Sequence, residues 1–116
     1  MDQLLNETID TFNEYIQKVP TGSTVIAELL REDRIIEALN NIKNFTEGTL
    51  WLVDANELFK QNNVNSDLDI SKINEYLIEI NEGLALQDYS LVADLFEYEI
   101  APFFEETQNV MISDKS

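Results

Sequence analysis

The stretch DISKINEYLIEINEGL, residues 69–84, decides the class of fold. Its apolar residues return every three or four positions, at Ile70, Ile73, Leu77, Ile80 and Leu84. This spacing places them on one side of an α-helix, because about 3.6 residues complete one turn. Asp69 or Ser71 is a suitable N-cap, since a short oxygen-bearing side chain accepts hydrogen bonds from the first turn. We therefore predict a helix here with one buried face.

Similar spacing recurs on both sides of that stretch. The first helix should stop near Lys18, because Pro20 lacks a backbone N–H and restricts the residue before it. A polar interruption at residues 31–34 is either a tight break or one exposed turn of a longer helix. A final helix should begin after residues 87–88, and Pro102 should kink or end it. In the second segment, the apolar residues assigned to the helical stripe are Ile35, Ile36, Leu39, Ile42, Leu50 and Val53.

The chain has few residues that interrupt helices. Three Gly and two Pro in 116 residues are too few for a sheet of many strands. Gly48, inside a helical segment, is expected to mark a close helix crossing. We predict an all-α bundle of four to five helices in one domain covering residues 1–116. Residues 107–116 are expected to form a flexible tail, with docking of Val110, Met111 and Ile112 onto the bundle as the alternative.

Composition excludes several classes of function. The chain has no His and no Cys, so it lacks the commonest general base, the thiol nucleophile and the usual zinc ligands. Its formal net charge of −16 argues against binding to nucleic acid or to anionic membranes. No apolar run is long enough to span a bilayer, and the first residues do not resemble a signal peptide. We expect a cytoplasmic protein that is not an enzyme and has no cofactor.

One arrangement of acidic residues offers an alternative. Glu79 and Glu82 lie on one predicted helix, and Asp94 and Glu97 lie on the next. In antiparallel helices these four carboxylates could converge on Mg²⁺ or Mn²⁺, which prefer oxygen ligands. The pattern is similar to the acidic helices of all-α nucleotide pyrophosphohydrolases of the MazG type, although position 78 is Ile where that family has a paired Glu. The competing interpretation, that they are solvated helix faces, predicts no metal site.

The C-terminal part of the chain also suggests a binding surface. No Lys or Arg occurs between Ile73 and Asp114, so this half of the chain is strongly anionic. An exposed apolar patch within it could grip a partner helix. The residues assigned to this patch are Phe103, Phe104, Met111 and Ile112. The competing interpretation places these side chains in the core.

The chain resembles two groups of small helical proteins, and the second resemblance favours a binding protein. Residues 88–102 resemble the C-terminal part of small acidic helical proteins from low-GC Gram-positive bacteria, a resemblance that implies no functional residue. In size, acidity and helical content the chain is similar to small secretion or flagellar chaperones, which sheath an amphipathic helix. The preferred hypothesis is a non-enzymatic protein–protein interaction module of the bacterial cytosol, chaperone- or adaptor-like, whose partner is a basic or apolar helix. The alternatives are the Mg²⁺-dependent hydrolase and an acidic mimic of DNA.

Overall fold

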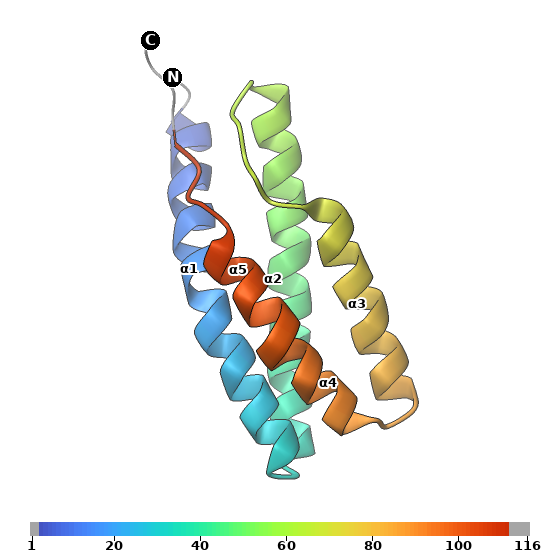
Figure 1. Cartoon of the computed structure of the whole chain (residues 1–116). Helices are drawn as coiled ribbons and strands as arrows, with labels where there is room; N and C mark the ends of the chain where they lie inside the picture. The colour runs from blue at the N-terminus through green and yellow to red at the C-terminus, as the bar shows by residue number, and fades with distance from the viewer. Residues whose placement is uncertain (1–2, 112–116) are drawn as a thin grey trace.

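The protein is all helical in a computed structural model that describes residues 3–111. This part of the chain contains no β-strand, so the predicted fold class is confirmed. The last three elements follow one another without a break and form one helical segment, so four helices pack together (Figure 1). None of the described helices is long and apolar enough to cross a membrane. The elements are α1 (Gln3–Arg31), α2 (Ile35–Gln61), α3 (Ile70–Ala85), α4 (Tyr89–Leu95), the π-helix η1 (Phe96–Ile100) and α5 (Ala101–Glu106).

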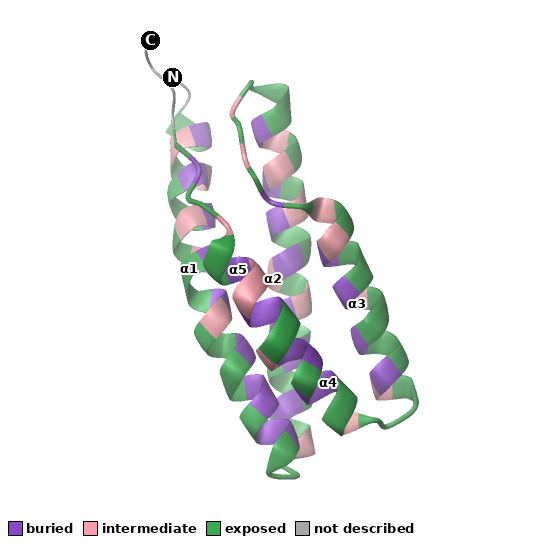
Figure 2. Cartoon of the chain, viewed as in Figure 1, coloured by how far each residue is buried: buried purple, intermediate pink, exposed green. Residues whose placement is uncertain are grey.

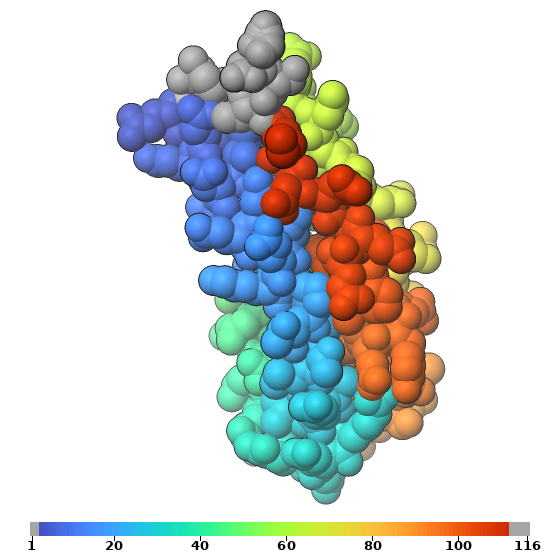
Figure 3. Space-filling model, turned by 60° about the vertical axis from the view of Figure 1, so that its left-hand side comes forward, coloured from blue at the N-terminus to red at the C-terminus, as the bar shows by residue number. Residues whose placement is uncertain are grey.

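Helix α1 is the centre of the bundle. It packs against α2 on one side and against α4, η1 and α5 on another, whereas α3 packs mainly against α4. In Figure 1 the segment α4–η1–α5 lies in front of α2, between α1 and α3. Figure 3 shows the same segment running alongside α1. The molecule is elongated, with principal extents of 51 × 21 × 21 Å.

Aromatic pairs join the inner face of α2 to its neighbours. Phe59 meets Phe12 of α1, and Phe45 meets Phe96 of η1, each pair edge to face with ring centroids 5.1 Å apart. Pairs of this geometry contribute about 0.5–1.5 kcal/mol beyond the area they bury. Figure 2 shows buried positions on the side of α2 that faces α4, η1 and α5. One face of α2 therefore belongs to the core.

Aspartates cap the starts of α3 and α4. The carboxylate of Asp69 accepts a hydrogen bond from the backbone N–H of Lys72 at 3.1 Å, which confirms one of the two predicted caps of α3. Asp88 caps α4 in the same way, through the N–H of Leu91 at 3.2 Å. Each cap satisfies an N–H group that the first turn of a helix leaves without a partner.

Helices α1, α2 and α3 all end in the same motif. A residue with positive φ follows each helix: Asp33 at 63°, Asn63 at 60° and Gln87 at 55°. The backbone N–H of the residue after it donates a hydrogen bond to the carbonyl five residues earlier. In α1, the N–H of Arg34 donates to the carbonyl of Leu29 at 2.9 Å. This is a Schellman motif, which gives partners to carbonyl groups at a helix end. The interruption at residues 31–34 is therefore a tight break.

Pro20 does not end the first helix, although the sequence had predicted that it would, and Pro102 does not end the last helical segment. Helix α1 continues through Pro20 to Arg31, because residues on both sides of Pro20 bury their side chains in the same core. The packing outweighs the local loss of one backbone hydrogen bond. The last helical segment continues past Pro102 to Glu106. Just before Pro102, the N–H of Ala101 donates to the carbonyl of Phe96, five residues earlier. This hydrogen bond spans one residue more than in an α-helix, as is typical of a π-helix.

Residues 107–111 lie against the bundle in a non-helical conformation. The N–H of Gln108 donates to the carboxylate of Asp67 at 3.1 Å. The side chain of Val110 is buried, and its backbone is hydrogen-bonded to Asn13 of α1. Val110 thus docks onto the bundle, as the alternative to a flexible tail predicted, whereas Met111 is 75% exposed. Ile112 and the remaining predicted tail lie outside the described residues.

Candidate functional site

The four acidic residues of the hydrolase alternative do not form a metal site. Among residues 3–111, no group of three or more acidic side chains is placed to hold a metal ion. Asp94 and Glu97 instead bind Arg31, at the C-terminal end of α1. The convergence of carboxylates that a Mg²⁺-dependent hydrolase requires is therefore missing from the described structure.

Arg31 links α1 to the last helical segment. Its Nη2 lies 2.8 Å from Asp94 Oδ1, and its Nη1 contacts Glu97 Oε1. Both hydrogen bonds raise the pKa of Arg31, and the bond to Glu97 has the larger effect. The guanidinium also lies over the Tyr98 ring, 5.9 Å from its centroid. All of these groups are at the surface, so the cluster contributes little to the stability of the fold.

The predicted apolar patch near the C-terminus is not one continuous surface. Phe104 is 2% exposed and belongs to the core, as the competing interpretation stated. Phe103 is half-buried and meets Tyr76 edge to face, with centroids 5.5 Å apart. Met111 is 75% exposed, and Ile112 lies outside the described residues. Phe104 is thus unavailable to a partner, and Met111 is the only one of the three described residues that is fully accessible.

A different apolar surface was missed by the sequence analysis. It runs along the side of α2 that faces away from the core. Four large apolar side chains are exposed there: Ile36, Leu39, Leu50 and Trp51. Ile36 is 78% exposed and Leu50 51%. Three of them had been assigned to the helical stripe of this segment, but the buried side of α2 consists of other residues: Ala38, Ile42, Phe45, Thr49, Leu52, Ala55 and Phe59.

We define the outer face of α2 as Ile36, Leu39, Lys43, Glu47, Leu50 and Trp51. At 100° per residue these six positions fall within about one third of the helix circumference, opposite Phe45. Lys43 and Glu47 occupy the middle of this face, with apolar residues towards both ends. In the described part of the chain, neither charge has an ion-pair partner.

Charge is distributed unevenly between this helix and the opposite side of the bundle. Helix α2 carries four carboxylates and two lysines, whereas residues 70–106 carry nine carboxylates and one lysine. The outer face of α2 therefore combines exposed apolar side chains with the less acidic part of the surface. An approaching apolar surface meets less electrostatic repulsion here than over α3 and α4.

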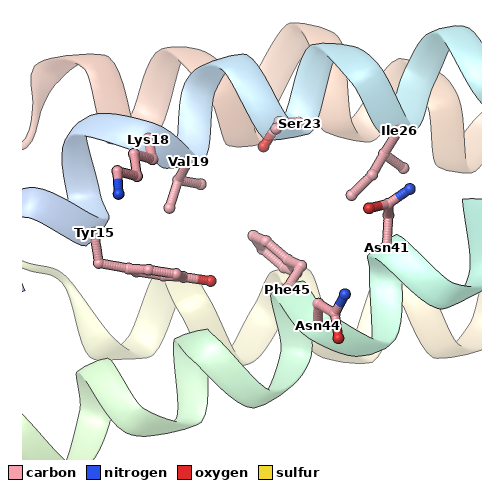
Figure 4. Close-up of a pocket in the computed structure, with 9 residues that line it drawn as sticks. Tyr15, Lys18, Val19, Ser23, Ile26, Asn41, Asn44 and Phe45 are labelled. Atoms are coloured by element: carbon pink, nitrogen blue, oxygen red, sulfur yellow. The ribbon is translucent and has the colours of Figure 1, made fainter.

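A small pocket lies between α1 and α2 (Figure 4). Its volume is about 230 Å³, below the range of typical sites for cofactors or drug-sized molecules. Val19, Ile26 and Phe45 supply its apolar lining, and Lys18 lies at its edge. The hydroxyl of Ser23 is buried there without a hydrogen-bond partner. The pocket has room for a single side chain or a very small molecule.

Tyr15 closes one end of this pocket. Its ring lies so close to Gly48 that a Cβ at position 48 would overlap the Tyr15 hydroxyl. Gly48 thus marks a close approach between α1 and α2, as its position in the sequence predicted. Burial raises the pKa of the Tyr15 hydroxyl, because the phenolate would lose solvation.

The chain matches a family model over most of its length. A family model described as "Domain of unknown function (DUF8042)" matches residues 7–110, which include all of α2, α3, α4, η1 and α5 and most of α1. No curated protein and no solved structure matches the chain.

Proposed function

The chain belongs to the DUF8042 family, a domain of unknown function, and we propose that it is a non-enzymatic protein–protein interaction module that binds through the outer face of α2. One observation carries this proposal: α2 has apolar side chains on two opposite faces, and the bundle covers only one of them. A helix that is apolar on both sides is typical of a helix that is covered on both sides.

The energetics favour a covered outer face. Complete burial of one Leu or Ile side chain contributes about 1.5–3 kcal/mol. Single exposed apolar residues are common on protein surfaces, but a row of them on one helix is typical of an interaction site. On the outer face of α2, Ile36 and Leu39 lie at one end and Leu50 and Trp51 at the other, on either side of Lys43 and Glu47. Trp is also among the residues that contribute most to binding at interfaces.

The shape of this surface favours a helical partner. It is a straight strip along one helix, and a partner helix with apolar residues every three or four positions covers such a strip. The acidic surface of residues 70–106 supports solubility while the apolar face is uncovered. Sheathing of a partner helix fits the chaperone- or adaptor-like role in the bacterial cytosol that the sequence suggested.

Paired variants test the proposal. Leu50→Asp places a charge in the outer face of α2, whereas Ile78→Asp makes the same type of change at an exposed Ile on α3. Each tagged chain is used for affinity capture from the native cell, after circular dichroism has shown that both variants remain helical. We expect proteins captured by the native chain to be lost with Leu50→Asp and retained with Ile78→Asp.

A crosslinking measurement identifies the surface directly. A photoreactive amino acid replaces Leu39 in one variant and Glu79, on α3, in another. Crosslinks that form at position 39 and not at position 79 support binding through the outer face of α2. The proposal is overturned if the Leu50→Asp variant still captures the same proteins, or if crosslinks form only at position 79. Either result would show that the binding surface is not the outer face of α2.

A further inference from the structure

We infer that the partner helix on the outer face of α2 is α2 of a second copy of this chain, packed antiparallel around a two-fold axis. This inference rests on the proposed function and names the occupant of the same surface. It follows from the order of four residues of the outer face, Leu39, Lys43, Glu47 and Trp51, which is complementary to itself when reversed. A two-fold interface requires this property, because the same patch must serve on both subunits.

One position of the axis pairs both the charges and the apolar side chains. Lys43 and Glu47 are equally distant from position 45, and so are Leu39 and Trp51. With the axis level with position 45, Lys43 of each copy lies opposite Glu47 of the other. The same axis places Leu39 of each copy at the same level along the interface as Trp51 of the other. Leu50 lies beside Trp51 and packs next to this second pair.

The two central charges also select the direction of packing. In the antiparallel arrangement they form two Lys43–Glu47 pairs across the axis. In a parallel arrangement in register, Lys43 would face Lys43 and Glu47 would face Glu47, which is repulsive. Both side chains lack an ion-pair partner in the described monomer, so both are free to pair with another copy. Charges of this kind commonly set orientation where helices pair.

The distribution of charge permits two such acidic chains to meet. Each copy carries a net charge of −16, so most faces repel each other. Pairing through α2 keeps the nine carboxylates of residues 70–106 of each copy on the far sides of the dimer (Figure 1). The residual repulsion is screened over about 10 Å at roughly 0.1 M salt. The dimer should therefore be stronger at moderate than at low ionic strength.

The size of the contact sets the expected affinity. The strip from Ile36 to Trp51 is about 24 Å long at 1.5 Å per residue. A single pair of helices over that length buries less than the roughly 800 Å² per partner of a standard interface. We therefore expect a reversible dimer with a dissociation constant on the order of micromolar.

Charge reversal tests the inference on the full chain. Sedimentation equilibrium over a range of concentrations gives the dissociation constant of the native chain and of Lys43→Glu, Glu47→Lys and the double variant. We expect each single change to weaken the dimer by about tenfold or more, because it places like charges opposite each other. The double variant exchanges the two charges and should recover to within about threefold of the native value. Lys60→Glu, a matched change on α2 outside the outer face, should have a smaller effect than Lys43→Glu.

Each outcome separates self-association from the proposed function. A native chain that stays monomeric throughout overturns the second copy as occupant, and proteins still captured through the outer face of α2 would then leave the proposed function intact. A dimer that the double variant does not restore overturns the antiparallel register. If the native chain stays monomeric and Leu50→Asp does not change which proteins it captures, both proposals are overturned.

Discussion

The carboxamide of Asn13 binds both backbone polar groups of Val110. The Val110 N–H donates to Asn13 Oδ1 at 2.7 Å, and Asn13 Nδ2 donates to the Val110 carbonyl at 2.9 Å. One side chain on α1 thus gives partners to a non-helical residue 97 positions later in the sequence. Such partners are needed because unpaired backbone groups are costly when they are removed from water. The pair anchors residues 107–111 to the bundle.

Asn13→Ala should release this segment. We expect the free energy of unfolding to fall by about 1–3 kcal/mol, because the backbone of Val110 loses both partners. Hydrogen exchange at the Val110 amide should become faster, while amides in the middle of α3 change less. Asn74→Ala is the control, because Asn74 is exposed on α3. This substitution raises helix propensity by the same amount as Asn13→Ala. Equal stability of the two variants, measured by urea unfolding, would contradict an anchoring role.

The two glycines in long helices should respond oppositely to alanine. Gly48→Ala should lower the free energy of unfolding by about 1–2 kcal/mol, because the new Cβ would overlap Tyr15 and force its ring to move. Gly22→Ala should raise it by up to about 1 kcal/mol, since a Cβ there meets no atom within 4 Å and alanine favours the helix. Thermal unfolding measures both. An increase in the free energy of unfolding for both variants would show that helix propensity outweighs the contact with Tyr15.

Gln87 carries avoidable backbone strain. Its φ of 55° lies in the left-handed region, which a residue with a Cβ adopts at a cost of about 1 kcal/mol. Gln87→Gly should remove this cost and raise the free energy of unfolding by about 1 kcal/mol. Gln87→Ala is the matched control, because it removes the same side chain but keeps the Cβ. A glycine variant no more stable than the alanine variant would indicate that strain at this helix end is negligible.

The sequence predicted those parts of the fold that depend on local chemistry. The spacing of Ile73 and Ile80 indicated α3, and Asp69 was identified as one of two possible caps. The path of α1 beyond Pro20 could not be predicted in this way, because packing against other helices outweighs the local preference of proline. The Asn13–Val110 pair was equally inaccessible, since a contact between distant residues leaves no local pattern.

The candidate site was harder to predict than the fold. Leu39 and Leu50 have helical spacing, and spacing alone does not distinguish a core face from a face exposed to solvent. A signal was nevertheless present, because α2 has more large apolar residues than one helical stripe can accommodate. For Phe104, one of the predicted contact residues, only the packing of the last helical segment against α1 shows that it is buried.

Stability should fall in alkaline solution, because two tyrosines resist ionisation in the folded state. Burial raises the pKa of Tyr15, and burial followed by the nearby carboxylate of Glu99 raises that of Tyr76. In the unfolded chain, tyrosine ionises near its ordinary pKa of 10.0. The raised pKa therefore stabilises the fold fully below pH 10 and progressively less as pH rises through the folded value.

Urea unfolding between pH 8 and 11 measures this effect. The free energy of unfolding should fall above pH 10, with a slope of at most about 1.4 kcal/mol per pH unit for each tyrosine. Tyr15→Phe should reduce that slope, and the double variant with Tyr76→Phe should reduce it further. Differences among these variants at pH 8 report packing and hydrogen bonding alone, which separates those contributions from ionisation. An unchanged slope in the double variant would show that Tyr15 and Tyr76 do not cause the alkaline loss of stability.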